Sequence, residues 1–280
     1  TGTARYTEAL TFTKKVIDEG GYSLAPNFVS MFSGDNNSSS EVIYPLIADP
    51  LVSQSFGNTT YIVNGSLNSA TMTLSSYGAT EGWGGHRATK AWYGLFGNLG
   101  TSTDDRAQLF WTAGHTYEMT DYKEWTNGYP SIKFRNSNFI GATTPTGFSG
   151  TDFPLFRLAD AYLMYAECAV RGAGNASTST ALGYVNALRE RANNGSSSAN
   201  INSSDMTLDF ILDERARELH WEGHRRTDLI RFGKFSGSSY LWPWKGNVAN
   251  GSPIPSYRKL FPIPQDAIIV NPNLIQNPGY

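Results

Sequence analysis

Apolar residues recur at helical spacing in three segments after residue 151, and this pattern limits the fold more than any other feature. Segments 153–171, 177–195 and 207–223 carry apolar residues three and four positions apart, as one buried helix face does. Serine or threonine opens the second and third segments, while glycine follows the first and ends the third, as caps and stop signals do. A short fourth helix is predicted at 225–233.

A further amphipathic helix is predicted at 4–19, where Gly20 and Gly21 supply the stop signal. Segments 41–47, 59–65 and 131–136 are rich in β-branched or aromatic residues and predict short strands. Small residues along paired helices suit tetratricopeptide-like stacking, although no 34-residue repeat is found. The predicted fold class is mainly α, with tetratricopeptide-like helices supporting a loop-rich region that has a few short strands.

The segment from 64 to 150 combines abundant Gly, Ser, Thr and Asn with many aromatic residues. It is too long to be structureless in a compact domain, so packed aromatics must order part of it. A short helix is predicted near 87–96, and the last residues, from about 257, suggest an extended tail that wraps over the body. Aromatic faces beside amide groups also suit sugar rings, although large loop-rich domains use aromatics as core.

Composition excludes several classes of partner. The formal net charge is −2, whereas nucleic-acid binding calls for a basic patch. Cys168 is the only cysteine, so no internal disulfide can form, and its helical context predicts a buried side chain. Charged residues are only 16% of the chain, a balance typical of loop-rich cell-envelope proteins. The chain starts without methionine inside a helical pattern, so we interpret it as the C-terminal portion of a longer protein.

Residues 211–235 concentrate charge in an otherwise lightly charged chain. Acids and bases stand three or four positions apart, which places each within reach of a partner on a helix. The predicted pairs are Asp213 with Arg217, Arg215 with Glu218, and Glu222 with Arg226. Catalytic carboxylates would instead be left unpaired across a cleft. This stretch therefore predicts a structural ion-pair network.

Motifs for catalysis are weak. His220 and His224 flank Glu222, but the order differs from that of zinc helices and Gly223 would break the turn that aligns the two rings. The sequence contains no phosphate-binding loop, dinucleotide fingerprint or serine-nucleophile motif. We therefore predict no enzyme activity, no cofactor and no metal.

Four ordered segments resemble the SusD/RagB family of bacterial outer-membrane lipoproteins, and they are closest to its starch-binding member. The segments are TDFPLFRLADAYLMYAE, ALGYVNALRERA, LDFILDERARELHWEGHRRTDLIRFGKF and LFPIPQDAIIVNPNLIQNPGY.

The resemblance implies a surface lipoprotein of Bacteroidetes that captures oligosaccharides, here starch-like α-glucans, and delivers them to a SusC-like TonB-dependent transporter for nutrient uptake. It implies localisation in the outer membrane, with the lipid anchor outside this chain. It also implies three parts: a helical segment (1–30), a loop-rich ligand-binding region (31–150) and a helical RagB/SusD region with an extended tail (151–280).

Starch-binding members of the family use an arc of aromatic residues and polar side chains, part of which lies in an N-terminal half that this chain lacks. The matching positions of this chain lie in its early loops. The residues expected to bind ligand are Phe32, Asn36, Asn37, Phe56, Tyr61 and Trp83. The alternatives are a scaffold that mainly docks the transporter, or capture of another glycan or a peptide.

Overall fold

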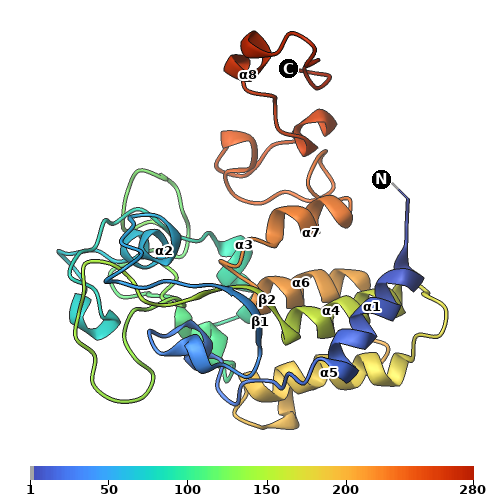
Figure 1. Cartoon of the computed structure of the whole chain (residues 1–280), viewed down its shortest axis with the longest axis horizontal. Coiled ribbons are helices and arrows are strands. Elements are labelled where there is room, and N and C mark those ends of the chain that lie inside the picture. Colours follow the sequence, from blue (N-terminus) through green and yellow to red (C-terminus); the bar gives the residue numbers. More distant parts are fainter. Residues whose placement is uncertain (1–2) are drawn as a thin grey trace. The chain divides into compact units, whose positions relative to one another are not determined.

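The computed structural model describes residues 3–280, which form two compact units divided after Gly223. The first unit holds a helical layer, a small sheet and a loop-rich part (Figure 1). Its helices and strands are α1 (Tyr6–Glu19), β1 (Val42–Leu46), α2 (Asn58–Ser66), α3 (Lys90–Tyr93), β2 (Phe153–Arg157), α4 (Leu158–Val170), α5 (Thr178–Ala192) and α6 (Leu208–Glu218). The second unit holds α7 (Arg225–Arg231) and α8 (Gln265–Val270). The predicted mainly α fold class is confirmed.

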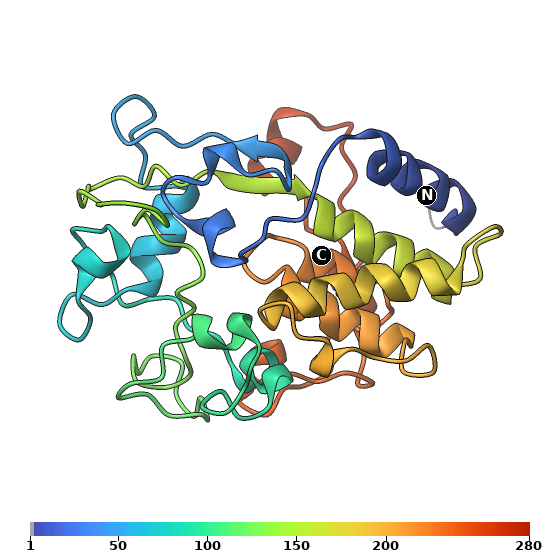
Figure 2. The same cartoon turned by 90° about the horizontal axis from the view of Figure 1, so that it is seen from below.

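Helix α4 lies at the centre of the helical layer and packs against α1, α5 and α6 (Figure 2). Its apolar face is fully buried at Leu163 and Ala166. The predicted caps are present: the Ser177 hydroxyl accepts a hydrogen bond from the backbone N–H of Thr180. Cys168 is buried in α4, as predicted. Local periodicity and capping thus account for the helices.

The loop-rich part lies to one side of the helical layer within the first unit (Figure 1). Aromatic rings pack within segment 64–150, as predicted: Tyr93 lies 4.4 Å from Tyr129 and 5.1 Å from Tyr117, measured between ring centroids. The helix predicted near 87–96 is also present, as α3 followed by a 3-10 turn, Gly94–Phe96.

Two of the predicted strands are wrong. Segment 59–65 lies in α2, because side chains of its first helical turn form hydrogen bonds with residues 149–151. The Thr59 hydroxyl donates to the carbonyl of Thr151, and the Thr60 hydroxyl accepts from the backbone of Ser149. These contacts outweigh the β propensity of the segment. In segment 131–136 only Ser131 forms a β-bridge.

The predicted start of the helix at 153 is also wrong. Residues 153–157 form β2, which pairs antiparallel with β1, and the helix begins at Leu158. The sheet has these two strands. Strand β1 fulfils the prediction of a strand at 41–47. Pro154 faces Pro45 in the register, and a sheet edge tolerates proline better than a helix interior does.

The second unit begins with α7, as predicted. Short turns follow, in which the Lys245 ammonium donates to the carbonyl oxygens of Gly237 and Tyr240. The predicted extended tail includes α8, and its wrapping over the body stays a prediction. Across residues 3–280, no helix is both long and apolar enough to cross a membrane.

Candidate functional site

The charge-rich stretch contributes α6, which buries Glu214 and Glu218 one turn apart. Glu218 contacts Arg191 and lies 2.8 Å from Arg106 and 2.7 Å from Arg157, measured between carboxylate oxygens and guanidinium nitrogens. These arginines come from three separate segments. The predicted structural ion-pair network is therefore present, and it joins the helical layer to the loop-rich part.

The partners in this network differ from those predicted within the stretch. Since α6 ends at Glu218 and Gly223 has a φ of +82°, Glu222 does not continue the helix. The observed pairs are Glu222 with Lys133 and Arg157, Arg215 with Asp160, and Arg217 with Glu214.

Arginines determine the electrostatics of the network. Burial alone would raise the pKa of Glu214, but the guanidiniums of Arg106, Arg217 and Arg189 outweigh it and lower that pKa to about 2. At Glu218, burial would likewise raise the pKa. Arg191, Arg157 and Arg106 outweigh this effect, so the pKa of Glu218 is well below its usual value. Both acids are ionised at neutral pH and held by cations. This arrangement favours a structural role over acid–base chemistry.

These pKa shifts predict acid destabilisation. The pKa of Glu214 is lower in the folded chain than in the unfolded chain, so its stabilising contribution is complete above about pH 4.5 and is lost as pH falls toward 2. Protonation of Glu214 alone is expected to lower the free energy of unfolding by about 3 kcal/mol between about pH 6 and pH 2. Urea denaturation across that range measures the change. A stability that stays constant down to pH 3 would contradict the prediction.

His220 belongs to the core rather than to a metal centre. It is buried, and its ring stacks on Phe110 with a centroid distance of 5.4 Å. Burial first, and then Lys133, hold the pKa of His220 well below its usual value, so its ring is neutral. Among the described residues, no group of three or more His, Cys, Asp or Glu side chains is arranged to hold a metal ion.

Two of the expected ligand-binding residues lie inside the protein. Phe32 is 0% exposed. Asn36 is 5% exposed, and its amide donates to the carbonyls of Met31 and Asp152 and accepts from the backbone N–H of Asp152. Both side chains therefore serve the fold rather than a surface, which corrects the expected set. Asn37 is exposed and lines a small cavity of about 170 Å³ beside Val42.

The other three expected residues lie together and form what we call the aromatic platform: Phe56, Tyr61 and Trp83. Their exposed fractions are 61%, 52% and 40%. The ring of Trp83 has its centroid 6.2 Å from that of Phe56 and 6.3 Å from that of Tyr61. Its indole N–H donates to the carboxylate of Glu81 at 3.2 Å. The platform thus combines apolar ring faces with a hydrogen-bond acceptor at its edge.

Backbone contacts hold the platform in place. Tyr61 lies on α2, and the loop that carries Trp83 is fixed to this helix because the Trp83 N–H donates to the Asn64 carbonyl at 2.8 Å. A Cβ atom at Gly65 would lie 2.3 Å from the ring of His86, so only glycine permits this close approach. The platform is a preformed surface.

Two supporting residues were not predicted. Phe148 packs 5.1 Å from Phe56 and His86 packs 4.5 Å from Tyr61, measured between ring centroids. Burial lowers the pKa of His86, against the effect of a backbone hydrogen bond at Ile62, so this ring is neutral. No sequence motif marks either residue, because each reaches the platform only through the fold.

The chain is similar in sequence to known proteins of one family. A model of the SusD family matches residues 104–280. The starch-binding protein SusD of Bacteroides thetaiotaomicron is 32% identical over 327 aligned positions, which cover 100% of this chain and 57% of that protein.

Solved structures of SusD superfamily and surface glycan-binding proteins are also similar to this chain. Surface glycan-binding protein A from Bacteroides thetaiotaomicron, in complex with laminarihexaose, superposes with a TM-score of 0.72 and 25% identity over 98% of this chain and 59% of that chain. A SusD superfamily protein from Bacteroides vulgatus gives a TM-score of 0.67 and 25% identity over 97% and 54%. The chain thus spans less than two thirds of the length of these relatives.

Proposed function

The chain belongs to the SusD family, and on that premise we propose that it binds starch-like α-glucans without cleaving them. The observation that carries the proposal is the aromatic platform, which presents three exposed rings on one surface. Sugar rings have apolar faces that stack on aromatic side chains, while their hydroxyls need polar partners such as Glu81. The starch-binding name of a relative that aligns with the whole chain supports the choice of ligand.

Calorimetry tests this proposal. Maltoheptaose is expected to give a saturable heat with a dissociation constant between about 10 μM and 1 mM, because a small, open platform contributes few contacts. Laminarihexaose and cellohexaose serve as matched glycans of other linkage. Binding of laminarihexaose alone would overturn the starch assignment, and no heat with any glycan would overturn the glycan-binding function.

We also propose that the protein acts at the bacterial outer surface, as part of a lipoprotein that delivers glycan to a TonB-dependent, SusC-like transporter. Exposed apolar residues around the small sheet support a docking role. Tyr44 and Phe156 face each other in the β1–β2 register, and Leu46 and Ile47 are also exposed. Exposed apolar groups of this kind suit protein contacts. Co-purification of the transporter, lost on Tyr44→Ser with Phe156→Ser, would support docking through this face, and unchanged co-purification would contradict it.

A further inference from the structure

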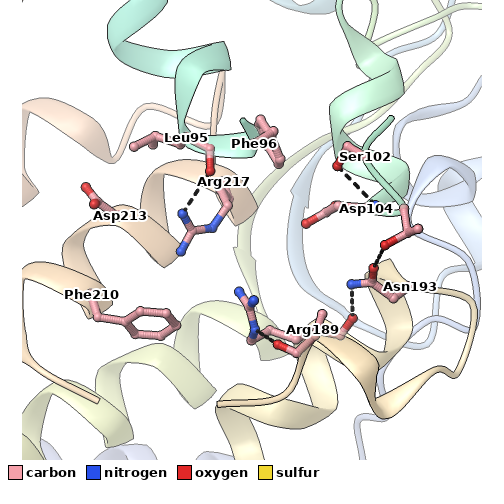
Figure 3. Close-up of a pocket in the computed structure, with 11 residues that line it drawn as sticks. Leu95, Phe96, Ser102, Asp104, Arg189, Asn193, Phe210, Asp213 and Arg217 are labelled. Carbon is pink, nitrogen blue, oxygen red and sulfur yellow. Dashed lines mark hydrogen bonds between the residues drawn. The ribbon is translucent and has the colours of Figure 1, made fainter. Parts of the chain in front are cut away.

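A second hollow in the first unit shares no residue with the aromatic platform. It lies between the 3-10 turn at Gly94–Phe96, α5 and α6, and has a volume of about 360 Å³ (Figure 3). This volume falls in the range of small-ligand sites. The lining residues that the argument uses are Phe96, Thr103, Arg189, Phe210, Asp213 and Arg217.

Two guanidiniums enter the hollow from different helices. Arg189 comes from α5 and Arg217 from α6, and the central carbon of each lies 5.6 Å from the centroid of the Phe210 ring. Their side chains are only 17% and 12% exposed, so both are held by the structure. Figure 3 shows the two guanidiniums and the Phe210 ring around the same space.

A single carboxylate oxygen serves both cations. Glu214 Oε2 lies 2.8 Å from Arg189 Nη1 and 2.8 Å from Arg217 Nη2, while its other oxygen contacts Arg106. A guanidinium has five N–H donors. Arg189 uses its Nε on the carbonyl of Ala199 and Nη1 on Glu214, which leaves Nη2. Arg217 uses Nε and Nη2 on Glu214 and Nη1 on the carbonyl of Leu95, which leaves one N–H on each Nη. The pair can therefore donate to another anion.

The other residues that line the hollow indicate which kind of anion it could bind. A guanidinium matches a planar carboxylate through paired hydrogen bonds. Phe210 and Phe96 are the aromatic residues of the lining, and the carboxylates of Asp104 and Asp213 also line the hollow and would repel a second negative charge. We propose that this hollow binds one uronic acid residue, with its carboxylate on Arg189 and Arg217 and its ring against Phe210. This site is independent of the proposed α-glucan platform.

Isothermal titration with sodium D-glucuronate tests the site. Saturable binding is expected, with acetate and D-glucose each at least about tenfold weaker, because each supplies only half of the contacts. Arg189→Gln is expected to weaken glucuronate binding by at least about tenfold. Thr103→Trp should do the same by filling part of the hollow that Thr103 lines while leaving every charge in place. Thr101→Trp, two positions away in the same loop and outside the lining, is its matched control.

Each outcome decides the proposal. Glucuronate binding that is lost in Thr103→Trp and kept in Thr101→Trp supports it, provided that both variants keep their melting temperature. No saturation up to about 50 mM, equal binding of acetate, or full binding by the Thr103→Trp variant would overturn it. Maltoheptaose affinity should be unchanged in the Thr103→Trp variant, which separates failure here from failure of the platform.

Discussion

Replacing Glu218 with glutamine is expected to lower the free energy of unfolding by about 3–5 kcal/mol, because one buried carboxylate holds three buried cations. Glutamine has the same shape but no charge, and its NH₂ group would face a guanidinium. Arg106, Arg157 and Arg191 would lose the anion that they share. For a unit of this size the melting temperature should fall by about 10 °C.

Urea denaturation and thermal melting measure this effect. The matched control is Glu19→Gln, at an exposed glutamate whose only described cation, Lys15, is 4.0 Å away; its effect should stay within about 0.5 kcal/mol. Maltoheptaose affinity at a temperature where the Glu218→Gln variant is folded should match that of the parent chain. A variant with unchanged stability and lost affinity would instead place Glu218 in a binding site.

Local features of the sequence predict the helical layer. Apolar spacing and caps such as Ser177 and Thr207 depend only on residues a few positions apart, and both hydroxyls accept the expected backbone hydrogen bonds. The family resemblance covers the segments of α4, α5 and α6. Helices α1, α4, α5 and α6 could therefore be predicted, with errors only where their ends are determined elsewhere.

Contacts between distant segments could not be predicted in this way. Segment 59–65 has strand-like composition, yet Thr59 and Thr60 bond to residues about 90 positions away and form part of a helix. The partners of the buried charges could not be predicted from local sequence either. Charge spacing suggested partners within α6, whereas Glu218 contacts Arg106, 112 positions away. A pattern can show that charges need partners, but only the fold decides which partners they meet.

The same reasoning applies to the candidate binding surface. The family resemblance pointed to six positions in the loops, and the structure brings three of them together while burying Phe32 and Asn36. Sequence alone does not show whether a loop aromatic fills the core or faces solvent, because both uses favour the same residue types. The structure shows that Phe32 is buried and Trp83 is exposed. This difference in exposure identifies the residues to test by mutation.

Replacing Trp83 with alanine is expected to weaken maltoheptaose binding by about tenfold or more, because the indole packs near both other rings of the platform and its loss removes one of the three exposed rings. Loss of one stacking ring corresponds to about 1–2 kcal/mol of binding free energy. Stability should change little, since the ring is 40% exposed and the Trp83 hydrogen bond to Asn64 comes from the backbone. Calorimetry and thermal melting measure the two effects separately.

Phe139→Ala is the matched control for this variant. Phe139 is a 44% exposed aromatic residue outside the platform, and its contact with Asp35 uses the backbone N–H, which alanine keeps. Tyr61→Ala should resemble Trp83→Ala, because its ring is 52% exposed on the same surface. If Phe139→Ala loses affinity while both platform variants keep it, the ligand binds elsewhere. Loss in the two platform variants alone would assign binding to rings that the fold, rather than the local sequence, has placed side by side.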